Sequence, residues 1–134
     1  MGYLSQKTKE YNGYVEGVTV DMFDKKKYTP DYIDSLEVET NFYDRKRKLN
    51  DNSDAFLILP GGIGTADEFF DVLNLASLGL ITKKIIVYNK NDCWTDLLTW
   101  IDKAKNMEML RTIPKNLVIA ENIDELIFAL KSYV

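Results

Sequence analysis

A glycine-rich turn followed by a carboxylate is the part of this sequence best suited to chemistry. Residues 60–68 read PGGIGTADE and follow the apolar run at 55–59. Gly61, Gly62 and Gly64 allow the backbone to adopt positive φ and to approach a ligand closely. A helix that begins after such a turn offers unpaired N–H groups and the positive end of its dipole. A strand, a glycine turn and a helix start in this order therefore favour a phosphate site.

The turn differs from the two best-known phosphate motifs. Asp67 stands where the dinucleotide-binding pattern has its third glycine, and no Gly-Lys-Ser/Thr follows as in a P-loop. Glycine also serves many strand-to-helix turns for geometry alone. Thr65 and Glu68 fit a T-x-x-E capping box, in which Thr65 caps the helix and Glu68 bonds back to the Thr65 N–H. The ligand turn and the simple helix start both stay open at this point.

The charges around the turn suggest what kind of ligand it would hold. Asp67 and Glu68 would repel a phosphate placed directly over them, so a pure anion site does not need them. Glu68 suits a positive charge that develops beside the phosphate, such as a ribose oxocarbenium ion. Residues 44–48 read DRKRK, and Arg45 could clamp a phosphate or hydrogen-bond a leaving purine, although it cannot act as an acid or base. The same basic run is also explained as a solvated helix face.

Composition narrows the functional classes. The chain has 134 residues, a net charge of −4, one cysteine and no histidine. The length predicts a single domain over residues 1–134. The acidic balance argues against nucleic-acid and anionic-membrane partners, and the lack of a signal-like or membrane-spanning run predicts a cytoplasmic protein. Without histidine the commonest general base and zinc ligand are missing, so we expect no metal site.

Hydrophobic periodicity predicts an α/β fold with a mainly parallel sheet and helices on both faces. A charged loop is expected at 24–27, and Pro30 is expected to start a short helix or turn up to Ser35. Gly79 is expected to end the helix after the glycine turn. Strands are predicted at 14–20, 36–40, 55–59, 84–88 and 117–120, and helices at 2–11, 41–52, 65–78, 94–106 and 123–134.

Three segments together resemble the Lonely Guy family of cytokinin riboside 5′-monophosphate phosphoribohydrolases, long mislabelled as lysine decarboxylases. They are DRK at 44–46, SDAF at 53–56 and PGGIGTADE at 60–68. The family signature is an R-K pair followed by P-G-G-x-G-T-x-x-E. The resemblance implies a Rossmann-like three-layer sandwich, a homodimer without a cofactor, and hydrolysis of a nucleoside 5′-monophosphate, AMP or a cytokinin riboside monophosphate, to free base and ribose 5-phosphate.

The resemblance also assigns roles to residues of this chain. Arg45 and Glu68 match the catalytic arginine and glutamate, and Lys46 matches the second signature position, which implies substrate binding. The implied phosphate-binding residues are Gly61, Gly62, Gly64 and Thr65.

Family members begin with a strand, a helix and a strand that this sequence does not match. We therefore expect a Rossmann-like domain without these elements, in which dimerisation or strand exchange covers apolar strand edges. Two alternatives to the enzyme remain: a non-catalytic nucleotide- or cofactor-binding module of the same superfamily, and a chain that only assembles.

Overall fold

The computed structural model describes residues 2–24 and 32–132 and divides into two compact units, Met1–Asn52 and Ser53–Val134. The single domain over residues 1–134 stays a prediction. The expected loop at 24–27 and the turn begun by Pro30 lie largely outside the described residues. Among the residues described, no helix is long and apolar enough to cross a membrane.

The first unit contains a small parallel sheet covered by helices. β1 and β2 pair in parallel, with Glu16 opposite Ser35 and Val20 opposite Glu39. The helix before β1 ends where expected, since Asn12 takes the left-handed conformation (φ 59°) just after it. The elements of this unit are α1 (Gly2–Glu10), β1 (Glu16–Val20), α2 (Asp21–Asp24), β2 (Ser35–Glu39) and α3 (Phe42–Asn52).

Asp34 joins three segments of the first unit. Its carboxylate accepts hydrogen bonds from Lys9 Nζ (2.6 Å) and from the Val15 N–H (2.8 Å). Its own N–H donates to the Val15 carbonyl (2.9 Å). The hydrogen bond from Lys9, and next the one from the Val15 N–H, lower the pKa of Asp34. The start of β1 is thereby tied to α1 and to the entry of β2.

The second unit alternates strands and helices around a three-stranded sheet. The strand order is β3-β4-β5, and both pairings are parallel. The α/β class with parallel sheets is therefore confirmed. The elements are β3 (Ala55–Ile58), α4 (Ile63–Ser77), β4 (Lys84–Tyr88), a 3₁₀ turn η1 (Lys90–Asp92), α5 (Thr95–Asn106), β5 (Leu117–Ala120) and α6 (Ile123–Lys131).

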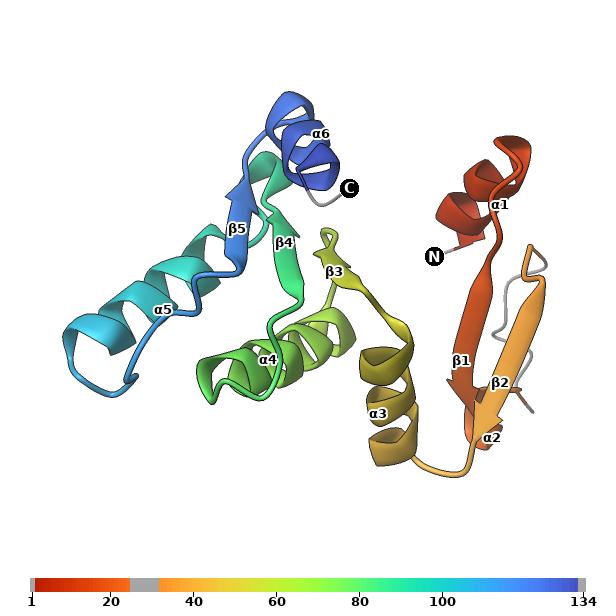
Figure 1. Cartoon of the computed structure of the whole chain (residues 1–134), viewed down its shortest axis with the longest axis horizontal. Helices are drawn as coiled ribbons and strands as arrows, with labels where there is room; N and C mark the ends of the chain where they lie inside the picture. Colours follow the sequence, from red (N-terminus) through yellow and green to blue (C-terminus); the bar gives the residue numbers. More distant parts are fainter. Residues whose placement is uncertain (1, 25–31, 133–134) are drawn as a thin grey trace. The chain divides into compact units, whose positions relative to one another are not determined.

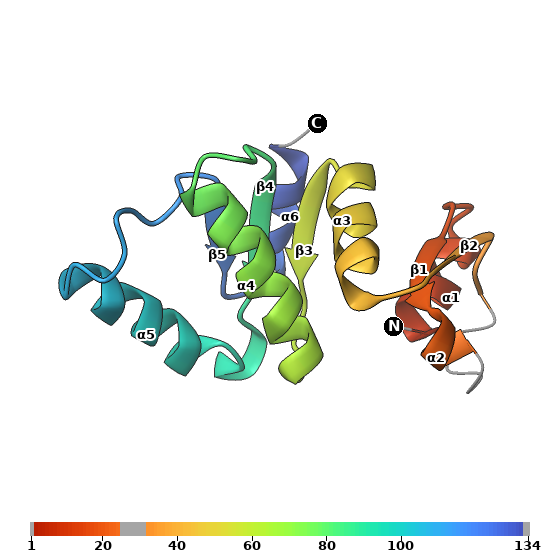
Figure 2. The same ribbon diagram turned by 90° about the horizontal axis from the view of Figure 1, so that it is seen from below.

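The sheet of the second unit lies between two helical layers. Figures 1 and 2 show α4 and α5 on one side of the sheet and α6 on the other. Ile85 and Val87 face α4 and α5, where Phe69 is fully buried, whereas Ile86 faces α6 and packs near Leu126. Alternate residues of β4 thus serve opposite faces, as the pleat requires. Each fully buried apolar side chain of this kind contributes about 1.5–3 kcal/mol.

Candidate active site

The glycine turn connects the end of β3 to the start of α4. Gly62 is the N-cap, with an extended backbone (φ −98°, ψ −157°), and Ala66 N–H donates to the Gly62 carbonyl (3.0 Å) as the first helical bond. The helix therefore begins at Ile63, two residues earlier than the predicted start at residue 65. The N-cap residue, Gly62, has no side chain with which to cap α4. Residues 61–64 are exposed, and the first N–H groups of an α-helix have no carbonyl partner within the helix, so the start of α4 offers donors of the kind that an anion site uses.

The glycines of the turn do not adopt the positive φ that the sequence suggested. Gly79 alone among the described glycines has positive φ (72°), so Gly61, Gly62 and Gly64 do not serve a left-handed backbone. A Cβ on Gly61 would lie 2.9 Å from Thr65 Cβ and closer still to Thr65 Oγ1, so the Thr65 side chain leaves no room there. A Cβ on Gly62 or Gly64 would meet nothing within 4 Å. The chain itself thus leaves the space beside Gly62 and Gly64 open.

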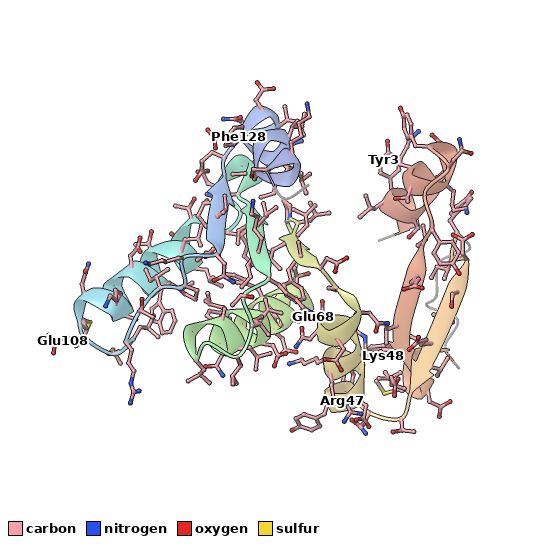
Figure 3. The ribbon with its side chains drawn as sticks, in the orientation of Figure 1. Tyr3, Arg47, Lys48, Glu68, Glu108 and Phe128 are labelled. Atoms are coloured by element: carbon pink, nitrogen blue, oxygen red, sulfur yellow. The ribbon has the colours of Figure 1, made fainter. Side chains whose placement is uncertain are left out.

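The capping-box interpretation of Thr65 and Glu68 is wrong. Since Gly62 is the N-cap, Thr65 is the third residue of α4 and cannot cap it. Thr65 and Glu68 lie three positions apart and share one face of the helix. Phe69 and Val72 belong to the buried stripe of α4, and the half-buried Glu68 borders that stripe. Glu68 therefore stands on the first turns of the helix, near the glycine turn (Figure 3).

Arg45 and Lys46 lie in the first unit, on α3. Asn41 caps this helix: its Oδ1 accepts from Asp44 N–H (2.9 Å), and its Nδ2 donates back to Asp44 Oδ2 (2.7 Å). Arg45 is partly buried, and its Nε donates to the carbonyl oxygen of Val18 in β1 (3.0 Å). The guanidinium of Arg45 is therefore bonded through Nε to the backbone of β1, which a solvated helix face would not require.

Arg47 and Lys48, two further cations of the DRKRK run, form ion pairs within the first unit. Arg47 pairs with Asp44 (3.0 Å), and its side chain is 74% exposed. Lys48 pairs with Glu37 of β2 (3.0 Å), and the hydrogen bond to Glu37 raises the pKa of Lys48. Figure 3 shows the two side chains on different sides of α3. The solvated-face explanation therefore fits Arg47, while Arg45 has a distinct environment.

A buried amide organises the neighbouring strand ends in the second unit. Asn89 follows β4 and is only 3% exposed. Its Nδ2 donates to Thr95 Oγ1 and to Glu121 Oε2 (both 2.9 Å), and its Oδ1 accepts from Trp94 N–H (2.7 Å). The amide thereby ties the ends of β4 and β5 to the start of α5. The sequence analysis gave Asn89 no role. A lone amide directly after an apolar strand could have indicated a buried polar contact at the strand end.

Five of the predicted site residues lie at one junction of the second unit, and the other two belong to the first unit. Gly61, Gly62, Gly64, Thr65 and Glu68 share the β3–α4 junction of the second unit. Arg45 and Lys46 belong to the first unit, so their pairing with Glu68 stays a prediction. Within residues 2–24 and 32–132, no group of three or more acidic or cysteine side chains could hold a metal ion.

The sequence matches known proteins along most of its length. A family described as "Possible lysine decarboxylase" matches residues 1–130. A cytokinin riboside 5′-monophosphate phosphoribohydrolase of Mycobacterium marinum is 30% identical over 126 residues, which cover 93% of this chain and 67% of the relative. One of the same name from Rhodococcoides fascians is 31% identical over 134 residues, covering 98% and 68%.

A plant relative gives the same result. The cytokinin riboside 5′-monophosphate phosphoribohydrolase LOG2 of Arabidopsis thaliana is 29% identical over 135 residues, covering 100% of this chain and 63% of the relative. The chain thus spans roughly two thirds of the length of these relatives, from 63% to 68%. The matches to the family and to these relatives show that this chain belongs to the possible lysine decarboxylase family, also called the Lonely Guy family.

Proposed function

We propose that this chain hydrolyses the N-glycosidic bond of a nucleoside 5′-monophosphate, AMP or a cytokinin riboside monophosphate. The products are the free base and ribose 5-phosphate. One observation carries the proposal: the backbone beside Gly62 and Gly64 is open at the start of α4, with Glu68 on the same end of the helix. The names of the family relatives, which are phosphoribohydrolases, support this class of reaction.

The glycine turn would hold the 5′-phosphate. Gly62 and Gly64 present bare backbone, and the first N–H groups of α4 supply donors together with the positive end of the helix dipole. Thr65 adds a hydroxyl on the same turn. A phosphate bound there is remote from the bond that breaks, so its binding energy serves to position the ribose.

Glu68 would act at the ribose. As the bond between C1′ and the base nitrogen breaks, positive charge develops on the sugar ring, and a carboxylate beside it stabilises that charge. Water adds to C1′, with Glu68 orienting it, and its proton leaves for solvent while the departing base takes up another. Arg45, with Lys46 beside it, would bind the substrate or stabilise the leaving base, because a guanidinium donates hydrogen bonds without losing its proton.

The test measures base release from AMP and from isopentenyladenosine monophosphate. Replacing Glu68 by glutamine keeps the shape and removes the charge, and we expect a loss of about 10²–10⁴-fold in rate. The matched control is Asp67→Asn, the same change at the exposed neighbouring residue, which should keep most of the activity. Similar rates in wild type and Glu68→Gln would contradict the proposal. Tight nucleotide binding by calorimetry without turnover would instead identify a non-catalytic binding module.

A further inference from the structure

Asn12 and Gly13 end α1 with a hydrogen-bonded turn that depends on both residues. The Gly13 N–H donates to the Thr8 carbonyl (2.8 Å) and the Asn12 N–H donates to the Lys9 carbonyl (3.0 Å), which are the two bonds of a Schellman motif. Asn12 takes the left-handed conformation (φ 59°), which asparagine tolerates better than most residues. A Cβ on Gly13 would lie 3.0 Å from the Thr8 carbonyl oxygen and closer still to Thr8 Cγ2, so position 13 has no room for a side chain.

The same two residues form the one Asn-Gly pair in the sequence. The Asn12 side chain is exposed, and in the part of the chain that the structure describes its amide makes no hydrogen bond. The backbone nitrogen that follows an asparagine can attack the carbonyl carbon of the asparagine side chain. Glycine hinders this attack least, because it has no Cβ. The residues that suit this helix end therefore also form a reactive pair at the surface.

We propose that Asn12 is a site of spontaneous deamidation, and that the folded end of α1 slows the reaction. The Gly13 nitrogen loses its proton and bonds to Cγ of Asn12, the bond from Cγ to the side-chain nitrogen breaks, and ammonia leaves with that proton. The product is a cyclic succinimide. Water then opens either carbonyl of the ring and gives aspartate or isoaspartate at position 12. Water is the co-reactant, and nothing is oxidised or reduced.

Two features of the turn oppose the attack while α1 is intact. Ring closure needs Cβ of Asn12 to eclipse the Gly13 nitrogen about the Cα–C bond, whereas the left-handed conformation places these two atoms on opposite sides of that bond. The Gly13 N–H must also be released from the Thr8 carbonyl, which accepts it at 2.8 Å. Both obstacles disappear when the last turn of α1 opens, and a helix end opens more easily than a core. The rate of deamidation should therefore follow the opening of this turn.

Isoaspartate would disturb the segment that joins α1 to β1. It routes the chain through the side chain of residue 12, which lengthens the backbone, and it leaves a free carboxylate at the C-terminal end of α1, where the helix dipole disfavours negative charge. Asp34 bonds to both sides of this point, since it accepts from Lys9 Nζ (2.6 Å) in α1 and from the Val15 N–H (2.8 Å) before β1. The longer link would strain these two bonds, so the modified protein should be less stable.

The wild-type protein tests the site with a control in its own sequence. Asn91 is also exposed and left-handed (φ 54°), but an aspartate follows it. Peptide mapping by mass spectrometry after storage in mildly alkaline buffer gives the rate at both positions, in the folded protein and in guanidinium chloride. In the unfolded chain Asn12 should convert faster than Asn91. In the folded protein Asn12 should convert at least about tenfold more slowly than in the unfolded chain, which corresponds to an opening free energy of about 1.4 kcal/mol.

Each comparison has a result that contradicts the proposal. Conversion at Asn12 no faster than at Asn91 in the unfolded chain would overturn the site. Equal rates at Asn12 in the folded and the unfolded protein would overturn the protection by α1.

Two substitutions test the consequence of the modification. Asn12→Gly removes the reactive amide and suits the left-handed conformation, so its urea midpoint should stay constant during storage, while that of wild type falls as isoaspartate accumulates. Freshly prepared Asn12→Asp adds the charge without lengthening the chain and should lose less stability than stored wild-type protein. A stored protein that contains isoaspartate and unfolds at the same urea concentration as fresh protein would overturn the proposed disturbance of the link between α1 and β1.

Discussion

Replacing Gly64 by alanine distinguishes a glycine turn that binds a phosphate from one that only starts a helix. A Cβ at this position would meet no protein atom within 4 Å, and Gly64 lies in the first turn of α4. Alanine is the better helix former, so the free energy of unfolding should rise by about 0.5 kcal/mol. If a phosphate approaches the Gly64 backbone, the added methyl group occupies that space, and AMP binding should weaken by about tenfold.

Gly61→Ala is the contrasting variant, because it should destabilise the folded protein itself rather than weaken ligand binding. The new Cβ would lie 2.9 Å from Thr65 Cβ, and such overpacking costs about 1–3 kcal/mol. Urea unfolding gives the stability of both variants, and titration calorimetry with AMP gives the affinity. A Gly64→Ala protein that binds AMP as tightly as wild type, or that is destabilised as much as Gly61→Ala, would refute a phosphate site at Gly64.

Three further substitutions test the description of the two units. Asp34→Asn should lower the free energy of unfolding at pH 7. Because a carboxyl with a lowered pKa stabilises the fold only while it is ionised, the difference from wild type should vanish as the pH falls through the folded-state pKa of Asp34. Urea unfolding at pH 7 and pH 2 checks this. Asn41→Ala removes the cap of α3 and should cost about 0.5–2 kcal/mol in the same assay, whereas Asn41→Ser keeps a capping oxygen and should cost less. Asn89→Ala leaves the Trp94 N–H without its buried acceptor, so it should cost at least about 1–3 kcal/mol and lower the unfolding temperature.

The order of elements was readable from the sequence because buried strands and amphipathic helices leave strong patterns. β3, β4 and β5 fall within a residue of the predicted ranges, and all observed pairs are parallel. Gly79 ends α4 with positive φ as expected, because glycine adopts that conformation without steric cost. These features depend on residues close together in the sequence, so local patterns were sufficient to predict them.

Helix starts were harder to predict, because several residues near each start could serve as the N-cap. The sequence suggested Thr65 as the cap of α4, yet the N-cap is Gly62, three residues earlier. The reciprocal cap occurs instead at Asn41, and Asn122 likewise accepts from Glu125 N–H (3.0 Å) to cap α6. At both helix starts an asparagine is followed three positions later by an acidic residue. The sequence therefore contained a capping pattern at these two helices, whereas the prediction assigned one to Thr65.

The environment of Arg45 could not be predicted at all. Its Nε reaches Val18, 27 positions away in the sequence, through the packing of α3 on β1. No local pattern reports a contact between a side chain and a distant backbone carbonyl. The openness beside Gly62 and Gly64 is similarly a property of the folded turn.

The most direct test of the central claim is the rate at which the protein converts AMP into adenine and ribose 5-phosphate, compared between Glu68→Gln and Asp67→Asn. We expect equal amounts of the two products from wild type, little change in Asp67→Asn, and a loss of about 10²-fold or more in Glu68→Gln. Equal rates in the two variants would contradict the role of Glu68, and the absence of either product from folded wild-type protein would contradict the proposed reaction.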